Sequence, residues 1–80
     1  MQIYVSNIGD LTEAELRLAF EQFGPVQRAT ICRDRTTGRS RNFGFVSMHP
    51  LGGGLAAIAE LDGTIIGSGR RPVVVEKSNL

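Results

Sequence analysis

The chain has 80 residues, of which 41% are hydrophobic and 21% charged, a composition typical of one small globular domain spanning residues 1–80. It contains no run of the ~18–20 apolar residues that a membrane span needs, so we expect no membrane partner. The formal net charge is only +1, yet five of the nine Lys and Arg residues lie between residues 28 and 41, which favours an anionic partner on one face.

Residue types that metal binding and catalysis require are sparse. Cys32 is the only cysteine and His49 the only histidine, which excludes an internal disulfide and a Cys/His zinc site. The sequence also lacks a nucleophile–base pair and paired carboxylates, so it predicts no enzyme activity and no cofactor. A single thiol fits a reducing compartment, and we therefore expect an intracellular, cytoplasmic protein.

The first element is predicted at residues 2–7, where apolar and polar side chains alternate. This alternation, with several β-branched residues, is typical of a strand. Because successive strand side chains point to opposite faces, Ile3 and Val5 share one face and Tyr4 lies on the other.

A helix is predicted next. Thr12 and Glu15 have the spacing of a capping box, in which each side chain hydrogen-bonds to the backbone of the other residue. Apolar residues then recur at helical spacing and predict one buried stripe, made of Leu16, Phe20 and Phe23. The Gly24-Pro25 pair is expected to end this helix.

Two further strands are predicted at residues 26–33 and 42–48, joined as a hairpin by an arginine-rich loop. In the second of these strands, Phe43 and Phe45 lie one residue apart and therefore share a face. The residues that alternate with them and share the opposite face are Gly44, Val46 and Met48.

The last third of the chain predicts one helix and one short strand. Three glycines at positions 52–54 precede the helical pattern, and glycine costs about 1 kcal/mol per helical position, so we expect the helix to begin late, between about Gly53 and Leu61. The glycines lack the Gly-Lys-Ser/Thr ending of a phosphate-binding loop, so no nucleotide site is predicted there. Residues 72–77 predict the last strand.

The order β-α-β-β-α-β predicts an α+β fold of the split βαβ (ferredoxin-like) type. Right-handed crossovers give a four-stranded antiparallel sheet in the order 4-1-3-2, with both helices on one face. The uncovered face then carries Tyr4, Phe43 and Phe45 on adjacent central strands. Exposed aromatic rings with arginines nearby favour single-stranded nucleic acid, since bases stack on the rings and guanidinium groups neutralise phosphates.

Two motifs carry a resemblance to the RNA-recognition-motif family. Residues 3–8 (IYVSNI) resemble the family's hexamer, and residues 41–48 (RNFGFVSM) resemble its octamer. Six of the eight octamer positions agree with the pattern K/R-G-F/Y-G/A-F-V-x-F/Y. Asn42 replaces a glycine, and asparagine tolerates left-handed backbone angles better than most residues. Met48 replaces an aromatic residue and is expected to face the core.

The resemblance covers essentially the whole chain and is closest in form to small single-domain bacterial members of the family. It implies a monomer that binds single-stranded RNA, with single-stranded DNA as a competitor to be tested. Tyr4 and Phe45 would each stack on one base, Phe43 would lie against the sugars between them, and Arg41 would pair with a phosphate. The other basic residues expected to contact RNA are Arg28, Arg39 and Lys77.

Three other interpretations remain open at the level of sequence. The octamer could be a strand with both phenylalanines buried in a core. The chain could be a protein-interaction module that uses the same sheet or the helical face. The same fold also hosts acylphosphatase-like hydrolases, and fold alone does not decide function.

Overall fold

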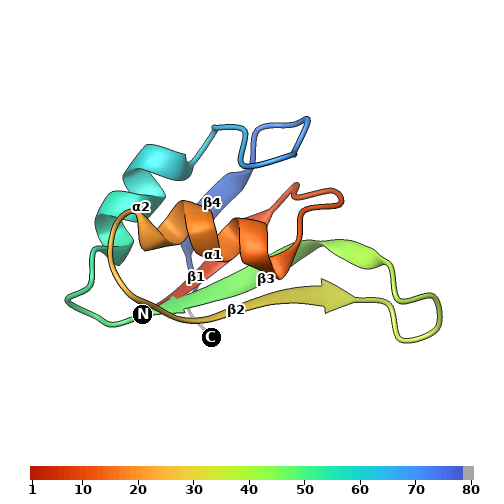
Figure 1. Ribbon diagram of the computed structural model, residues 1–80, viewed down its shortest axis with the longest axis horizontal. Helices are drawn as coiled ribbons and strands as arrows, with labels where there is room; N and C mark the ends of the chain where they lie inside the picture. The colour runs from red at the N-terminus through yellow and green to blue at the C-terminus, as the bar shows by residue number, and fades with distance from the viewer. Residues whose placement is uncertain (79–80) are drawn as a thin grey trace.

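The computed structural model describes residues 1–78, and its elements follow the predicted order (Figure 1). They are β1 (Gln2–Ser6), α1 (Glu13–Glu21), β2 (Val26–Arg33), β3 (Ser40–Met48), α2 (Gly54–Leu61) and β4 (Val74–Lys77). The hairpin between β2 and β3 projects beyond the rest of the molecule, so its loop is open to solvent on several sides (Figure 1).

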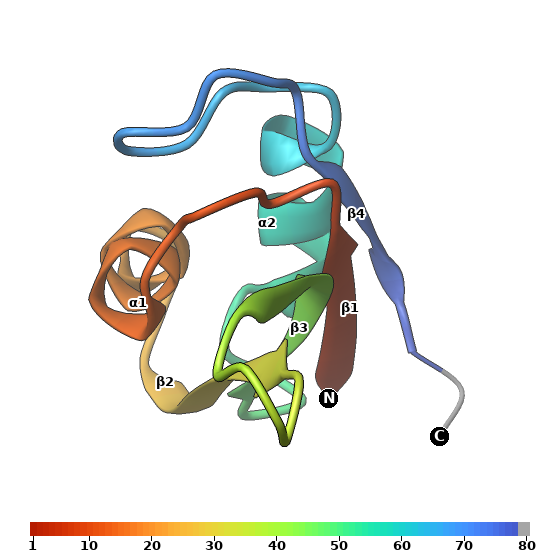
Figure 2. The ribbon, with the colours of Figure 1, turned by 90° about the vertical axis from the view of Figure 1, so that its right-hand side faces the viewer.

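The four strands form one antiparallel sheet in the order β2-β3-β1-β4, which confirms the predicted order 4-1-3-2. Both helices lie on one side of this sheet (Figure 2). The central strands β1 and β3 therefore have one face against the helices and one face without a covering element. This arrangement is the predicted ferredoxin-like fold.

Strand alternation decides which side chains enter the core. Ile3 pairs with Val46 and Val5 with Gly44, and all four residues are buried against the helices. The core continues on the helices and β4 through Leu16, Phe20, Ala57 and Val75. Met48 is also fully buried, as predicted. The aliphatic residues of the central strands thus face the helices, and the aromatic residues that alternate with them lie on the open face.

The start of α1 is stabilised by the predicted capping box. Thr12 Oγ1 accepts a hydrogen bond from the Glu15 N–H at 3.2 Å, and Glu15 Oε1 accepts from the Thr12 N–H at 3.1 Å. Glu15 Oε2 also accepts from the Ser68 N–H at 2.6 Å. One carboxylate therefore joins the first turn of α1 to the loop that precedes β4.

The second helix begins at Gly54, within the range expected from the glycine run. Gly53 precedes it with φ 90°, and a Cβ at this position would overlap the carbonyl group of Phe23. Glycine is needed here because the loop packs directly on the backbone that follows α1. This packing requires glycine at position 53.

Every buried residue in the described part of the chain is apolar or glycine. Within residues 1–78, neither helix is long and apolar enough to cross a membrane. The same residues contain no group of three or more His, Cys, Asp or Glu side chains placed to hold a metal ion.

Candidate nucleic-acid interface

The open face of the sheet presents three aromatic side chains at its centre. Tyr4 on β1 pairs directly with Phe45 on β3, and Phe43 lies two residues earlier on the same side of β3. All three side chains are half-buried, whereas Ile3 and Val46, on the other face of the same strands, are fully buried. The prediction that these rings lie outside the core is confirmed by this placement, and the interpretation with buried phenylalanines is wrong.

The three rings contact one another and form an aromatic cluster (Tyr4, Phe43 and Phe45). Tyr4 and Phe43 are stacked, with centroids 5.6 Å apart and an interplanar angle of 11°. Phe45 meets Tyr4 edge-on at 5.5 Å and 79°, and meets Phe43 at 6.2 Å and 90°. These distances and angles are the favourable ones for aromatic pairs, so the rings hold one another in place before any ligand arrives.

Arg41 extends the cluster with a positive charge. Its Cζ lies 5.6 Å from the centroid of the Phe43 ring, within the range of a cation–π contact, and the residue is exposed. The backbone N–H groups of Thr37 and Thr36 lower the pKa of Asp34, and the charge of Arg41 lowers it further. Arg41 is thus placed beside an aromatic surface with its guanidinium group open to solvent.

The octamer contains a bulge at the position where asparagine replaces glycine. Asn42 has φ 70°, a left-handed conformation that asparagine adopts more readily than most residues. Its Oδ1 accepts a hydrogen bond from the Gly9 N–H at 2.8 Å, and its carbonyl oxygen accepts from the Ile8 N–H at 3.3 Å. Asn42 therefore keeps the bulge and also ties β3 to the loop after β1, next to Arg41 and Phe43.

Two of the other predicted basic residues lie on or near the open face. Arg28 on β2 pairs with Ser47 of β3, which has its side chain on the same side as Phe45. Arg39 lies at the end of the exposed loop between β2 and β3, where its N–H donates to Thr37 Oγ1 at 3.3 Å. Both arginine side chains are free of ion pairs within residues 1–78 and are available to a ligand.

Lys77, the last of the predicted RNA contacts, does not lie beside the aromatic cluster. It pairs with Ile3, a core residue, so its side chain leaves β4 on the helix-covered side of the sheet. Glu76 pairs with Tyr4 and takes the position on the open face instead. The sequence pattern was ambiguous here because the relative register of β4 and β1 decides which of two adjacent residues lies beside Tyr4.

Arg33 is likewise removed from the arginine-rich surface by a partner on the helical side. Its Nη2 lies 2.9 Å from Glu13 Oε1, and this interaction, after a backbone hydrogen bond at Glu13 itself, lowers the pKa of Glu13. A phosphate would have to compete with this carboxylate. The five arginines of the basic segment are therefore not equivalent, although their spacing in the sequence does not distinguish them.

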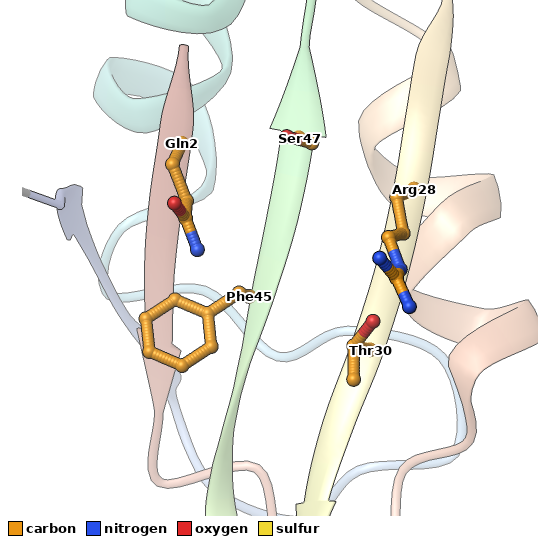
Figure 3. A pocket seen from close by; sticks show the side chains of 5 residues that line it. All are labelled: Gln2, Arg28, Thr30, Phe45 and Ser47. Carbon is orange, nitrogen blue, oxygen red and sulfur yellow. The ribbon is translucent and has the colours of Figure 1, made fainter. Parts of the chain in front are cut away.

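Two concave regions contain residues that sequence reasoning missed. One is a pocket of about 230 Å³ on the open face, called the Ser47 pocket, lined by Gln2, Arg28, Thr30, Phe45 and Ser47 (Figure 3). The other is a groove of about 550 Å³ in which Arg70 and Arg71 lie near residues 7–10. Alternation from Tyr4 and Phe45 could have identified Gln2 and Ser47, whereas the groove depends on how two distant loops meet.

The proteins that this chain is similar to are RNA-binding proteins. The sequence profile of the RNA recognition motif matches residues 3–70. The putative RNA-binding protein RbpA of Synechocystis sp. is 45% identical over 64 residues, which cover 79% of this chain and 63% of that protein. The mitochondrial glycine-rich RNA-binding protein 2 of Arabidopsis thaliana is 53% identical over 51 residues, which cover 64% of this chain and 32% of that protein. The matched segment thus spans less than two thirds of these relatives.

Solved structures of RNA-binding domains superimpose over all or nearly all of this chain. The crystal structure of RNA-binding protein PG1 superimposes with a TM-score of 0.90 at 37% identity, over 100% of this chain and 95% of that chain. The structure of the Rna15 RRM with bound RNA (GU) has a TM-score of 0.81 at 28% identity, over 99% of this chain and 83% of that one. The chain therefore belongs to the RNA recognition motif family, whose members are RNA-binding proteins rather than enzymes.

Proposed function

We propose that this protein binds single-stranded RNA on the open face of its sheet, with bases stacked on the aromatic cluster and phosphates paired with arginines. The observation that carries the proposal is the placement of Tyr4, Phe43 and Phe45 on two adjacent central strands without a covering element. An apolar surface of this kind does not serve the core, which lies on the other side of the sheet.

Stacking supplies the affinity and selects unpaired bases. Each base stacked on an aromatic ring contributes about 1–3 kcal/mol, and every base has a face that can stack. The bases of a duplex are already stacked on one another, so the cluster favours loops and single strands. In this proposal Tyr4 and Phe45 each hold one base, and Phe43 lies against the sugars between them.

Phosphate contacts add a charge-dependent contribution. Arg41 lies over Phe43 and is exposed, so its guanidinium group can reach the backbone of a strand whose bases stack on the cluster. Arg39, in the adjacent loop, is the second candidate for a phosphate contact. Glu76 lies beside Tyr4 and would repel a phosphate on the β4 side. The bound RNA strand is therefore expected to direct its phosphates toward the β2–β3 hairpin.

The proposal is tested by titrating a fluorescently labelled single-stranded RNA of about ten nucleotides with the parent protein and with Phe45→Ala. The variant should bind about 5- to 150-fold more weakly, which corresponds to 1–3 kcal/mol. Single-stranded DNA of the same sequence is the competitor, and duplex RNA is the negative control. Equal affinity of the parent and the variant for RNA would overturn the proposal.

Protein binding is the competing function. The helical side has exposed apolar residues, among them Leu18 at 66% and Ile65 at 59% exposure. These residues lie on the opposite side of the sheet from the aromatic cluster, so the two functions can be separated. A Leu18→Ser variant should leave RNA affinity unchanged if the open face is the binding surface.

A further inference from the structure

The Ser47 pocket exists because a small residue occupies the middle of a three-strand row. Ser47 on β3 pairs with Gln2 on β1 and with Arg28 on β2. Neighbouring strands lie about 4.8 Å apart, so the backbones of Gln2 and Arg28 are separated by about 9–10 Å across the small serine. The ring of Phe45 extends over β1 (Figure 3), and the pocket is lined by this ring together with Gln2, Arg28, Thr30 and Ser47.

A bulge in β2 directs Arg28 into this pocket. Val26 pairs with Met48 and Arg28 with Ser47, so two steps along β2 correspond to one step along β3. In a regular strand Val26 and Arg28 would share a face, and Val26 is buried. The extra residue, Gln27, lets the valine enter the core while the arginine joins the open face, as bulges commonly do near binding sites.

The polar side chains of the pocket are not engaged elsewhere. Those of Gln2, Arg28, Thr30 and Ser47 make no hydrogen bond or ion pair within residues 1–78. By contrast, two asparagines at the other end of the sheet use their side chains within the protein. Asn7 donates to the Pro72 carbonyl oxygen, and Asn42 accepts from the Gly9 N–H. The hydrogen-bonding capacity of the pocket is therefore available to a ligand that lies on Phe45.

The arrangement of donors and acceptors matches one base better than the others. A guanidinium group only donates, in a planar fork, and guanine presents two adjacent acceptors, O6 and N7, that fit this fork. Guanine also has N–H donors on its next edge, and the Gln2 amide on the opposite wall has an oxygen that can accept from them. Adenine would place an amino donor against Arg28, and uracil offers it only a single acceptor on that edge.

We propose that the Ser47 pocket receives the edge of a guanine that stacks on Phe45, and that Arg28 and Gln2 select this base. The inference rests on the proposed RNA binding and deepens it, since it names the base at one position. It also gives Arg28 a different role from Arg41: Arg28 contacts a base and Arg41 contacts a phosphate.

The test uses octamers of uridine that contain one guanine, adenine, cytosine or no substitution near the middle. A short strand can shift along the binding surface, so a single guanine can reach the pocket. The parent should bind the guanine octamer about 5- to 150-fold more tightly than the others. Arg28→Gln should lose this preference while binding the other three octamers within about threefold of the parent.

Two controls separate base recognition from charge. Arg35→Gln removes the same charge from the exposed hairpin loop, and any effect it has should be equal for all four octamers. Replacing guanine by 7-deazaguanine removes the N7 acceptor; this should weaken binding to the parent by about tenfold and leave binding to Arg28→Gln unchanged. Arg28 is exposed, so equal melting temperatures of Arg28→Gln and the parent are expected.

Each other outcome overturns the inference in a recognisable way. A uniform loss of affinity across all octamers, with a smaller salt dependence, would make Arg28 a phosphate contact. A parent that prefers uridine or adenine, or no base at all, would contradict guanine selection while Phe45→Ala still tests RNA binding. A parent that binds none of the octamers would overturn the proposed function as well.

Discussion

The rings of Tyr4 and Phe43 lie nearly parallel, 11° apart, although the two residues come from different strands. The contact holds both rings in one orientation, and Phe45 packs edge-on against each of them. A ligand that stacks here does not have to order these side chains first, so less conformational entropy is lost on binding. The cluster therefore has a double role, in which its rings support one another and also offer faces to bases.

Removing a single ring of the cluster should weaken RNA binding and should cost less stability than removing a core ring. Tyr4→Ala, Phe43→Ala and Phe45→Ala should each reduce RNA affinity by about 1–3 kcal/mol. Each ring makes two ring–ring contacts worth about 0.5–1.5 kcal/mol each, so the free energy of unfolding should fall by about 1–3 kcal/mol. Phe20→Ala, in the core, is the control and should cost about 3–5 kcal/mol of stability. A thermal melt in which Phe45→Ala unfolds as early as Phe20→Ala would contradict the assignment.

Arg41 should account for part of the salt dependence of RNA binding. For single strands the slope of log affinity against log salt is about −0.7 per neutralised phosphate, so we expect about −1 to −2 for the parent. Arg41→Gln should make the slope shallower by about 0.7 and leave the order of preferred sequences unchanged. Arg17→Gln makes the same change on α1 and should leave the slope as it is. Titrations of one labelled oligonucleotide at four salt concentrations measure this, and an unchanged slope for Arg41→Gln would assign the phosphate contacts to other residues.

Asn42 should be replaceable by glycine but not by alanine. Alanine at φ 70° is strained and also loses the hydrogen bond to the Gly9 N–H, so Asn42→Ala should reduce the free energy of unfolding by about 2–3 kcal/mol. Asn42→Gly also loses the hydrogen bond, but glycine adopts this backbone angle without strain. It should therefore reduce the free energy of unfolding by about 1 kcal/mol or less. Urea denaturation of the two variants checks this, and equal losses would show that the left-handed angle does not limit this position.

Glu15 should make stability depend on pH in the acid range. Hydrogen bonds from the side chain and backbone of Ser68, and then from the backbone of Thr12, lower its pKa from 4.5 to about 2. Because the folded-state pKa is lowered, the contribution is fully present above about pH 4.5 and is lost as the pH falls toward 2. Glu15→Gln keeps the capping geometry but has no charge, so its melting temperature should fall less steeply between pH 5 and pH 2.

Glu60→Gln is the matched control for this measurement, since Glu60 is exposed on α2 and its carboxylate makes no hydrogen bond within residues 1–78. Its pH dependence should follow that of the parent. If Glu15→Gln also follows the parent, the link between α1 and the loop before β4 does not contribute to stability. Some acid sensitivity should remain in every variant because the pKa values of Glu13 and Asp34 are lowered too.

The sequence by itself determined the elements, their order and the two faces of the central strands. These features depend on local periodicity: alternation separates Ile3 and Val5 from Tyr4, and helical spacing places Leu16 and Phe20 on one stripe. Local chemistry also predicted the capping box at Thr12. Such signals need only a few neighbouring residues, because each strand or helix presents its side chains with a fixed period regardless of its partners.

Only the tertiary structure decided how the polar residues divide between the faces and which of them meet. Lys77 lies opposite Ile3 in the sheet and therefore on the helical side. Arg33 forms an ion pair with Glu13, and a bulge in β2 places Arg28 beside Ser47. These outcomes depend on the register between strands that are far apart in sequence, and a shift of one residue exchanges the faces. The net charge of the segment between residues 28 and 41 is the same for every register, so charge and spacing alone do not show which arginine reaches a base, a phosphate or a carboxylate.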